Sequence, residues 1–179
     1  MLAQNIYYVV PVVNVDGLAA ISENFLKTGE ITMIRKNMNP HTQPCEGRDE
    51  LMGVDLNRNY GVDWSKEGGS STDPCAENYR GAFPFSEPET RAIRDFLVSH
   101  KDSIKFVYNF HAFGNMYLWP YNGQSPNTLG TVNPDVLNVF NEIWADSTFP
   151  AGTLRGNAWD SLRYTSSGEQ SDWILGELG

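Results

Sequence analysis

Residues 6–10 (IYYVV) form an uninterrupted run of β-branched and aromatic residues near the start of the chain. Such a run predicts a strand that is buried on both faces, as in a sheet that helices cover on each side. A chain rarely opens directly into a central strand, because terminal segments are commonly peripheral. The last residues, 174–179, likewise stop where another element begins. We therefore expect the sequence to be truncated at both ends.

Two further strands and one turn are predicted along the chain. Residues 105–110 alternate like a strand and carry His111 at its carboxyl end, and residues 117–121 form another short strand. Residues 14–17 (NVDG) carry the Asx and glycine residues that tight turns require. Residues 165–168 (TSSG) after Tyr164 predict a flexible stretch that could act as a flap.

Helices are predicted between these strands. Residues 86–89 (SEPE) match a capping box, and the helix that follows has an apolar face with Ile93, Phe96 and Leu97. Residues 133–134 (NP) open another helix, with proline in its first turn. Strands that alternate with helices predict an α/β layer structure. The chain has no internal repeat and no linker, so we expect one domain.

Composition excludes several classes of protein. The 179 residues are 40% hydrophobic, which is incompatible with a disordered or low-complexity chain. The formal net charge of −9 argues against nucleic acid or an anionic membrane surface as a partner. No apolar run reaches the roughly 18 to 20 residues that span a bilayer.

Cys45 and Cys75 flank a segment that is rich in polar and glycine residues. They can form a disulfide, or they can be two reduced thiols of an intracellular protein, and the spacing alone does not decide between these alternatives. A zinc pair is the weaker interpretation, because neither cysteine belongs to a C-x-x-C motif.

The segment 55–59 (DLNRN) places a carboxylate, two amides and a guanidinium within five residues. An arginine with amide neighbours can hold a carboxylate by charge-assisted hydrogen bonds, although a solvated polar loop is the commoner explanation of such a cluster. His111 follows a predicted strand, where ligands of α/β sheets gather. A lone histidine is nevertheless more often structural than a metal ligand. We expect His41 and His100 to face solvent.

Taken in order, these segments resemble the zinc metallocarboxypeptidases of the pancreatic carboxypeptidase A type. The resemblance covers essentially the whole chain, and its order and spacing are more specific than any single motif. It rests on residues 9–17, 34–37, 53–60, 79–81 and 85–89, on His111 and Tyr164, and on residues 167–168 and 172–173.

The resemblance implies a mixed, mostly parallel central sheet with helices on both faces. It also implies roles for three residues near a zinc ion. His111 would be the third zinc ligand, Arg35 would stabilise the oxyanion that forms when water attacks the scissile carbonyl, and Asp55 would orient a metal-bound histidine. The complete domain would hold one zinc ion, which leaves a coordination position open for water.

The resemblance further implies a site for the C-terminus of a peptide or protein substrate. Asn57 and Arg58 would bind the terminal carboxylate, and Tyr164 would close over the bound peptide. The family also favours a disulfide between Cys45 and Cys75, and with it a secreted or lumenal protein.

Two parts of the family's machinery are missing from the sequence. No histidine is followed by glutamate at the His-x-x-Glu offset, and the chain ends before the strand that should carry the catalytic glutamate. We therefore expect residues 1–179 to be a partial catalytic domain that binds zinc weakly or not at all and is inactive alone. The exposed edges of its truncated sheet would favour self-association.

Two alternatives to the carboxypeptidase are open. One is a pseudo-peptidase that binds peptide C-termini without catalysis, and the other is a related metal-dependent amidase or deacylase. For a carboxypeptidase, the small neutral Ser171 favours apolar or mixed C-terminal residues, whereas Glu169 keeps a basic preference open.

Overall fold

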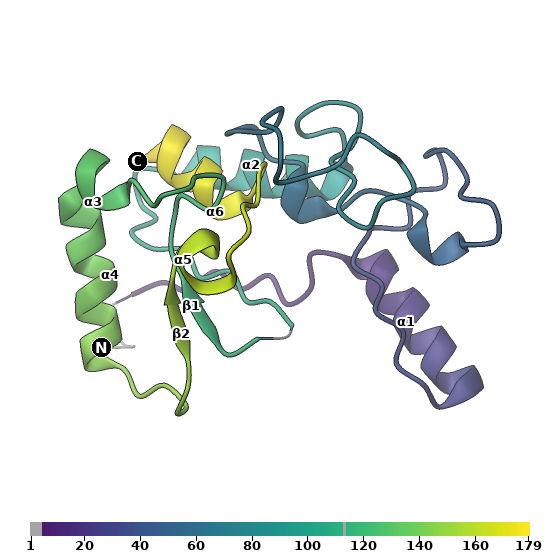
Figure 1. The fold of residues 1–179 in the computed structure, drawn as a ribbon, viewed down its shortest axis with the longest axis horizontal. Helices are drawn as coiled ribbons and strands as arrows, with labels where there is room; N and C mark the ends of the chain where they lie inside the picture. Colours follow the sequence, from purple (N-terminus) through teal and green to yellow (C-terminus); the bar gives the residue numbers. More distant parts are fainter. Residues whose placement is uncertain (1–4, 113) are drawn as a thin grey trace.

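The computed structural model describes residues 5–112 and 114–179 (Figure 1). Short helices and long irregular loops make up most of this part of the chain. The α-helices and strands are, in chain order, α1 (Val15–Thr28), α2 (Pro88–His100), β1 (Met116–Leu118), α3 (Leu129–Val132), α4 (Pro134–Asp146), β2 (Leu154–Gly156), α5 (Ala158–Leu162) and α6 (Gln170–Trp173). Shorter turns of other helix types are η2 (Asp49–Leu51), η3 (Leu56–Arg58) and η4 (Ile174–Leu178).

The strands β1 and β2 pair in parallel, with Met116 opposite Leu154 and Leu118 opposite Gly156. The helices α3 and α4 lie between them in the sequence and form the crossover that a parallel pair requires (Figure 1). The aromatic face of α4 covers this pair, because the ring of Phe140 lies 6.3 Å from Tyr117 and 6.1 Å from Trp119. The α/β class is therefore confirmed, as is the helix predicted from residues 133–134.

The two strands predicted at residues 6–10 and 105–110 do not form in this chain. Neither segment has strand pairing within the described residues. Most of their apolar side chains are exposed, to 80% at Ile6 and 89% at Phe110, although Val107 is half-buried against the core cluster. The burial predicted for residues 6–10 is therefore wrong. The side-chain pattern encodes a buried strand, but burial also needs neighbouring strands that this stretch of chain does not supply.

The turn predicted at residues 14–17 is instead the start of α1. The Asn14 side chain accepts a hydrogen bond from the Gly17 amide at 2.9 Å and so caps the helix. Gly29 ends the helix in the left-handed conformation, with φ at 74°. Asn at the start, Lys27 in the last turn and Gly29 after it are helix signals that the interpretation as a turn overlooked.

The helix predicted after residue 86 is confirmed as α2, but its capping box is wrong. Glu87 is the N-cap residue and Pro88 takes the first helical position. The Ser86 hydroxyl donates to the Glu87 carboxylate, and the Glu89 carboxylate accepts from Asn37 instead of from the helix end. The apolar face of α2 enters a core cluster in which Leu97 is buried with Tyr60 and Trp173.

A buried amide, Asn59, ties the loop after η3 to the start of α2. Its Nδ2 donates to the Arg80 and Phe83 carbonyls and to the Ser86 hydroxyl. Its Oδ1 accepts from the Thr90 hydroxyl at 2.8 Å. Because a buried amide with both ends satisfied tolerates few rearrangements, this residue holds the irregular loops in one conformation.

Cys45 and Cys75 form a disulfide, with their Cα atoms 5.5 Å apart. Closing a loop with a sequence separation of 30 residues stabilises the folded chain by about 3 to 4 kcal/mol in the chain-entropy view. The Lys36 ammonium joins two parts of the segment that this disulfide encloses, because it donates to the Leu51 and Pro74 carbonyls. Burial lowers the pKa of Lys36.

Among the described residues, no helix is both long and apolar enough to cross a bilayer.

Candidate active site

Asn57 and Arg58 lie on η3, a single turn that Asp55 begins. The Asp55 Oδ1 accepts from the Asn57 amide at 3.1 Å, which caps the turn. The Asp55 amide in turn donates to the Tyr79 carbonyl. The local sequence DLNR therefore positions both residues that are predicted to bind a carboxylate.

The Arg58 guanidinium is buried, with only 6% of its side chain exposed. Its Nε donates to the Gly69 carbonyl and its Nη1 to the Asn57 carbonyl, both at 2.8 Å. The Glu169 Oε1 lies 3.6 Å from Nη1. The backbone carbonyls orient the guanidinium, and Glu169 supplies its counter-charge.

Arg35 and Asp55 form an ion pair, with Nη2 and Oδ2 2.7 Å apart. The Asp55 side chain is buried, whereas nearly half of the Arg35 side chain is exposed. Within the described residues, Asp55 Oδ2 has no hydrogen bond of suitable geometry, and its direct partner is the Arg35 guanidinium, with the positive charge of Lys36 close by. The structure thus brings Arg35, Asp55, Asn57 and Arg58 together.

The segment 165–170 packs tightly on the loops around Arg58, contrary to the prediction of a flexible stretch. Ser166 and Ser167 are buried, and the Gly168 carbonyl accepts from the Tyr60 amide at 3.0 Å. The Gln170 amide donates to Asn57 Oδ1 at 3.2 Å. These contacts join parts of the chain that are more than 100 residues apart.

Glycines permit this close approach. A Cβ added at Gly168, whose φ is 69°, would lie 2.4 Å from the Arg58 carbonyl oxygen. A Cβ at Gly69 would lie 2.3 Å from the Ser167 amide nitrogen. Both contacts are with backbone atoms, which cannot turn aside as a side chain can.

Within the described residues, no hydrogen bond or ion pair joins Tyr164 or His111 to this cluster. The Tyr164 side chain, predicted to close over substrate, is half exposed at 48%. His111 is exposed on an irregular segment because the strand predicted before it does not form. His41 is exposed as predicted, whereas His100 is half-buried and stacks on Phe96 with ring centroids 4.4 Å apart.

The described residues do not fit a zinc ion by themselves. Three ligands are the minimum that a catalytic zinc takes from the protein. No group of three His, Cys, Asp or Glu side chains within residues 5–112 and 114–179 is arranged to hold a metal. One feature is compatible with a metal site in a longer protein, namely the buried Asp55 Oδ2, which has an ion pair with Arg35 but no hydrogen bond within the described residues.

The sequence motifs do not mark Asp172 as a site residue, but the structure buries its side chain fully beside the cluster. Its carboxylate accepts from the amides of Asn122 and Gly123 at 2.8 and 2.9 Å and so anchors α6 to the loop after β1. Burial, with a contribution from Glu169, raises the pKa of Asp172 to about 7, although the two amides oppose this shift. The available signal was the place of residues 172–173 among the segments that carry the family resemblance.

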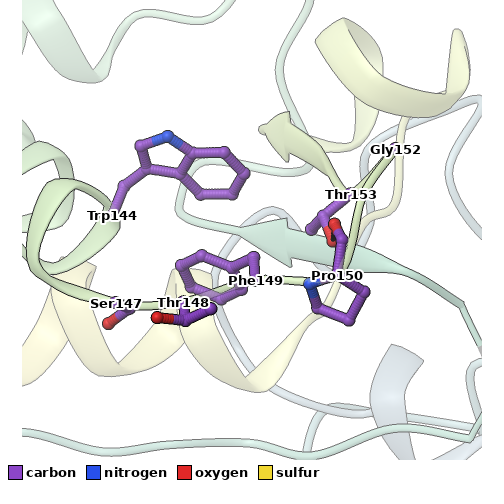
Figure 2. Close-up of a pocket in the computed structure, with 7 residues that line it drawn as sticks. All are labelled: Trp144, Ser147, Thr148, Phe149, Pro150, Gly152 and Thr153. Atoms are coloured by element: carbon purple, nitrogen blue, oxygen red, sulfur yellow. Dashed lines mark hydrogen bonds between the residues drawn. The ribbon is translucent and has the colours of Figure 1, made fainter.

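A surface recess of about 370 Å³ lies elsewhere. Figure 2 shows the Trp144 and Phe149 rings side by side in its lining, and their centroids are 4.5 Å apart. The recess lies between the end of α4 and the segment leading to β2, and none of the predicted site residues lines it. The Arg58 cluster, and not this recess, is therefore the candidate site.

Comparison with known proteins identifies the class to which this fold and cluster belong. The family model for zinc carboxypeptidases matches residues 1–179. The chain belongs to the zinc carboxypeptidase family.

Individual relatives agree with this assignment. The chain is 33% identical over 182 residues to human mast cell carboxypeptidase A and 38% identical over 173 residues to mouse carboxypeptidase A6, in each case over 97% of its length. Bovine thrombin-activatable fibrinolysis inhibitor, solved in complex with tick carboxypeptidase inhibitor, matches 94% of the chain with a TM-score of 0.66 and 30% identity.

The chain spans only part of these relatives. It covers 38% of the human enzyme, 36% of the mouse enzyme and 53% of the bovine chain. The family's members are hydrolases, and zinc is the metal that the family's name carries.

Replacing Gly168 by alanine is expected to destabilise the chain by about 1 to 3 kcal/mol, because the new Cβ meets a backbone carbonyl in addition to the strain of a positive φ. Urea unfolding would measure the loss. Gly152→Ala is the matched control, since Gly152 has a φ of 81° but nothing within 4 Å of its Cβ. Equal losses in the two variants would contradict the close-packing argument.

Asp172 is expected to make stability depend on pH. Because its pKa is raised on folding, Asp172 keeps a proton in the folded chain at pH values where the unfolded chain has released it. The stabilisation that this proton gives is therefore complete below about pH 4 and is lost as the pH rises through about 7. The unfolding free energy of the wild type relative to Asp172→Asn should fall by up to about 1 kcal/mol per pH unit in this window.

Chemical denaturation at pH 5, 6 and 7 would measure this difference for Asp172. The exposed Asp102→Asn variant is the control that should show no such trend. A difference for Asp172→Asn that stays constant or grows with pH would contradict the prediction.

Proposed function

We propose that Asn57 and Arg58 bind the free C-terminal carboxylate of a peptide, as the substrate-recognition part of a zinc carboxypeptidase. The supporting observation is the buried Arg58 guanidinium, which backbone carbonyls hold in a fixed orientation next to Asn57. A pre-oriented guanidinium binds a carboxylate strongly because no ordering of the side chain is needed on binding.

The remaining roles belong to the same proposal. Arg35, which is half exposed beside Asp55, would stabilise negative charge on the substrate's scissile carbonyl, and Asp55 would orient a histidine that holds the metal. His111 would be one zinc ligand, and Tyr164 would close over the bound peptide. The half-exposed ring of Tyr164 is consistent with a residue that moves when substrate binds.

In this proposal, residues 1–179 form part of a catalytic domain. A single histidine leaves most coordination positions of zinc to water, so this chain would bind zinc weakly and would not hydrolyse peptides alone. The disulfide between Cys45 and Cys75 supports a secreted or lumenal location, since disulfides persist in oxidising compartments.

A non-catalytic peptide binder is the second candidate. Asn57 and Arg58 are oriented by hydrogen bonds to the Asp55 carboxylate and to backbone carbonyls of the chain itself. Carboxylate recognition can therefore operate without hydrolysis in this chain.

The chain is expected to bind N-acyl-phenylalanine without cleaving acyl dipeptides, even with added zinc. Arg58→Ala should weaken this binding by at least about tenfold, because the charge-assisted contact to the carboxylate is lost. Isothermal titration calorimetry would measure the affinity, and chromatography would detect release of the C-terminal residue.

Arg48→Ala, at an exposed arginine outside the cluster, is the control for this experiment. Binding that does not depend on Arg58 would contradict the proposed recognition site. Release of the C-terminal residue that a chelator stops would contradict the proposed inactivity of this chain.

We also propose that the chain self-associates through segments 6–10 and 105–110, where most apolar side chains are exposed and the backbone lacks strand pairing within the described residues. Val9→Lys should shift the population towards monomer in sedimentation velocity. Leu26→Lys, at an equally apolar and exposed position on α1, should not. A wild type that is monomeric at all concentrations would refute this proposal.

A further inference from the structure

Glu169 occupies the position beside Arg58 that a ligand carboxylate would otherwise take as counter-charge. Its Oε1 lies 3.6 Å from Arg58 Nη1, and both side chains are largely buried. The Ser166 hydroxyl donates to the same oxygen at 2.5 Å, and the Ser171 hydroxyl contacts Oε2 at 3.4 Å. The carboxylate is thus held in place by two hydroxyls as well as by charge.

The backbone on each side of Glu169 is fixed as well. The Gly168 carbonyl accepts from the Tyr60 amide, and the Gln170 amide donates to Asn57. Because the neighbouring residues are anchored to the loop that carries Arg58, Glu169 cannot leave the site by a movement of its backbone alone.

The acidic residues around Arg58 weaken its attraction for a ligand anion. Glu169 already neutralises the guanidinium, and the buried Asp172 lies near enough to Glu169 for the two acids to repel each other. The hydrogen bonds that Arg58 makes within the described residues come from Nε and Nη1, so Nη2 is the donor that remains for a ligand. A ligand carboxylate at Nη2 therefore approaches an arginine whose charge is already compensated.

We propose that Glu169 is a specificity-determining residue of the carboxylate site: it shares Arg58 with the ligand's terminal carboxylate and disfavours ligands with a second negative charge. This inference rests on the proposed function, in which Arg58 binds peptide C-termini. The physical reason is Coulomb repulsion in a largely buried site, where solvent screens charges weakly. C-terminal aspartate and glutamate are the residues that this repulsion excludes.

The experiment compares two probes, N-acetyl-phenylalanine and N-acetyl-glutamate, by titration calorimetry on the whole chain. Glu169→Gln is expected to bind N-acetyl-phenylalanine about tenfold more tightly than the wild type, and N-acetyl-glutamate by a larger factor. Glu169→Ala provides a second variant, which removes the carboxylate without offering an amide to Arg58. Glu177→Gln removes an equal charge from an exposed position and should change neither affinity.

The outcomes separate this inference from the proposed function. If binding depends on Arg58 but Glu169→Gln and Glu169→Ala bind both probes as the wild type does, the role of Glu169 is overturned and the proposed function stands. Equal tightening for the two probes refutes the discrimination against a second charge. If no variant binds either probe in a manner that depends on Arg58, both proposals fail.

Discussion

The close approach of the backbone at Gly168 to the carbonyl of Arg58 is the contact on which the candidate site depends. It brings the segment 165–170 onto the turn that carries Asn57, and it puts Glu169 beside the buried guanidinium. Any side chain at residue 168 would separate the two segments. The arrangement of charges therefore follows from a backbone contact that only glycine permits.

Buried polar groups fix the conformation of the irregular loops in this chain, as a large apolar core does in other domains. Asn59 satisfies both ends of its amide inside the loops, and Asp172 accepts two backbone amides. Such groups cost free energy when they lose their partners, so they specify one arrangement of otherwise irregular chain. This explains how a part of the chain with few strands can still hold Arg58 in a defined orientation.

Sequence patterns predicted the local features well and the contacts between distant segments poorly. The helices α2 and α4 follow from periodic apolar residues and from prolines at their starts. The pairing of Cys45 with Cys75, favoured by the family resemblance, is present. Residues 165–168 were interpreted as flexible because small polar residues favour loops, yet tertiary contacts bury two of them.

The sequence by itself determined the family and the α/β class, because short-range motifs and their order encode these properties, and it supplied the residues of the proposed carboxylate site. The tertiary structure decided that Glu169 pairs with Arg58 and that Arg35 pairs with Asp55. It also decided that residues 6–10 are exposed although their composition is that of a buried strand. Burial and ion pairing depend on which distant segments come into contact, and no local pattern contains that information.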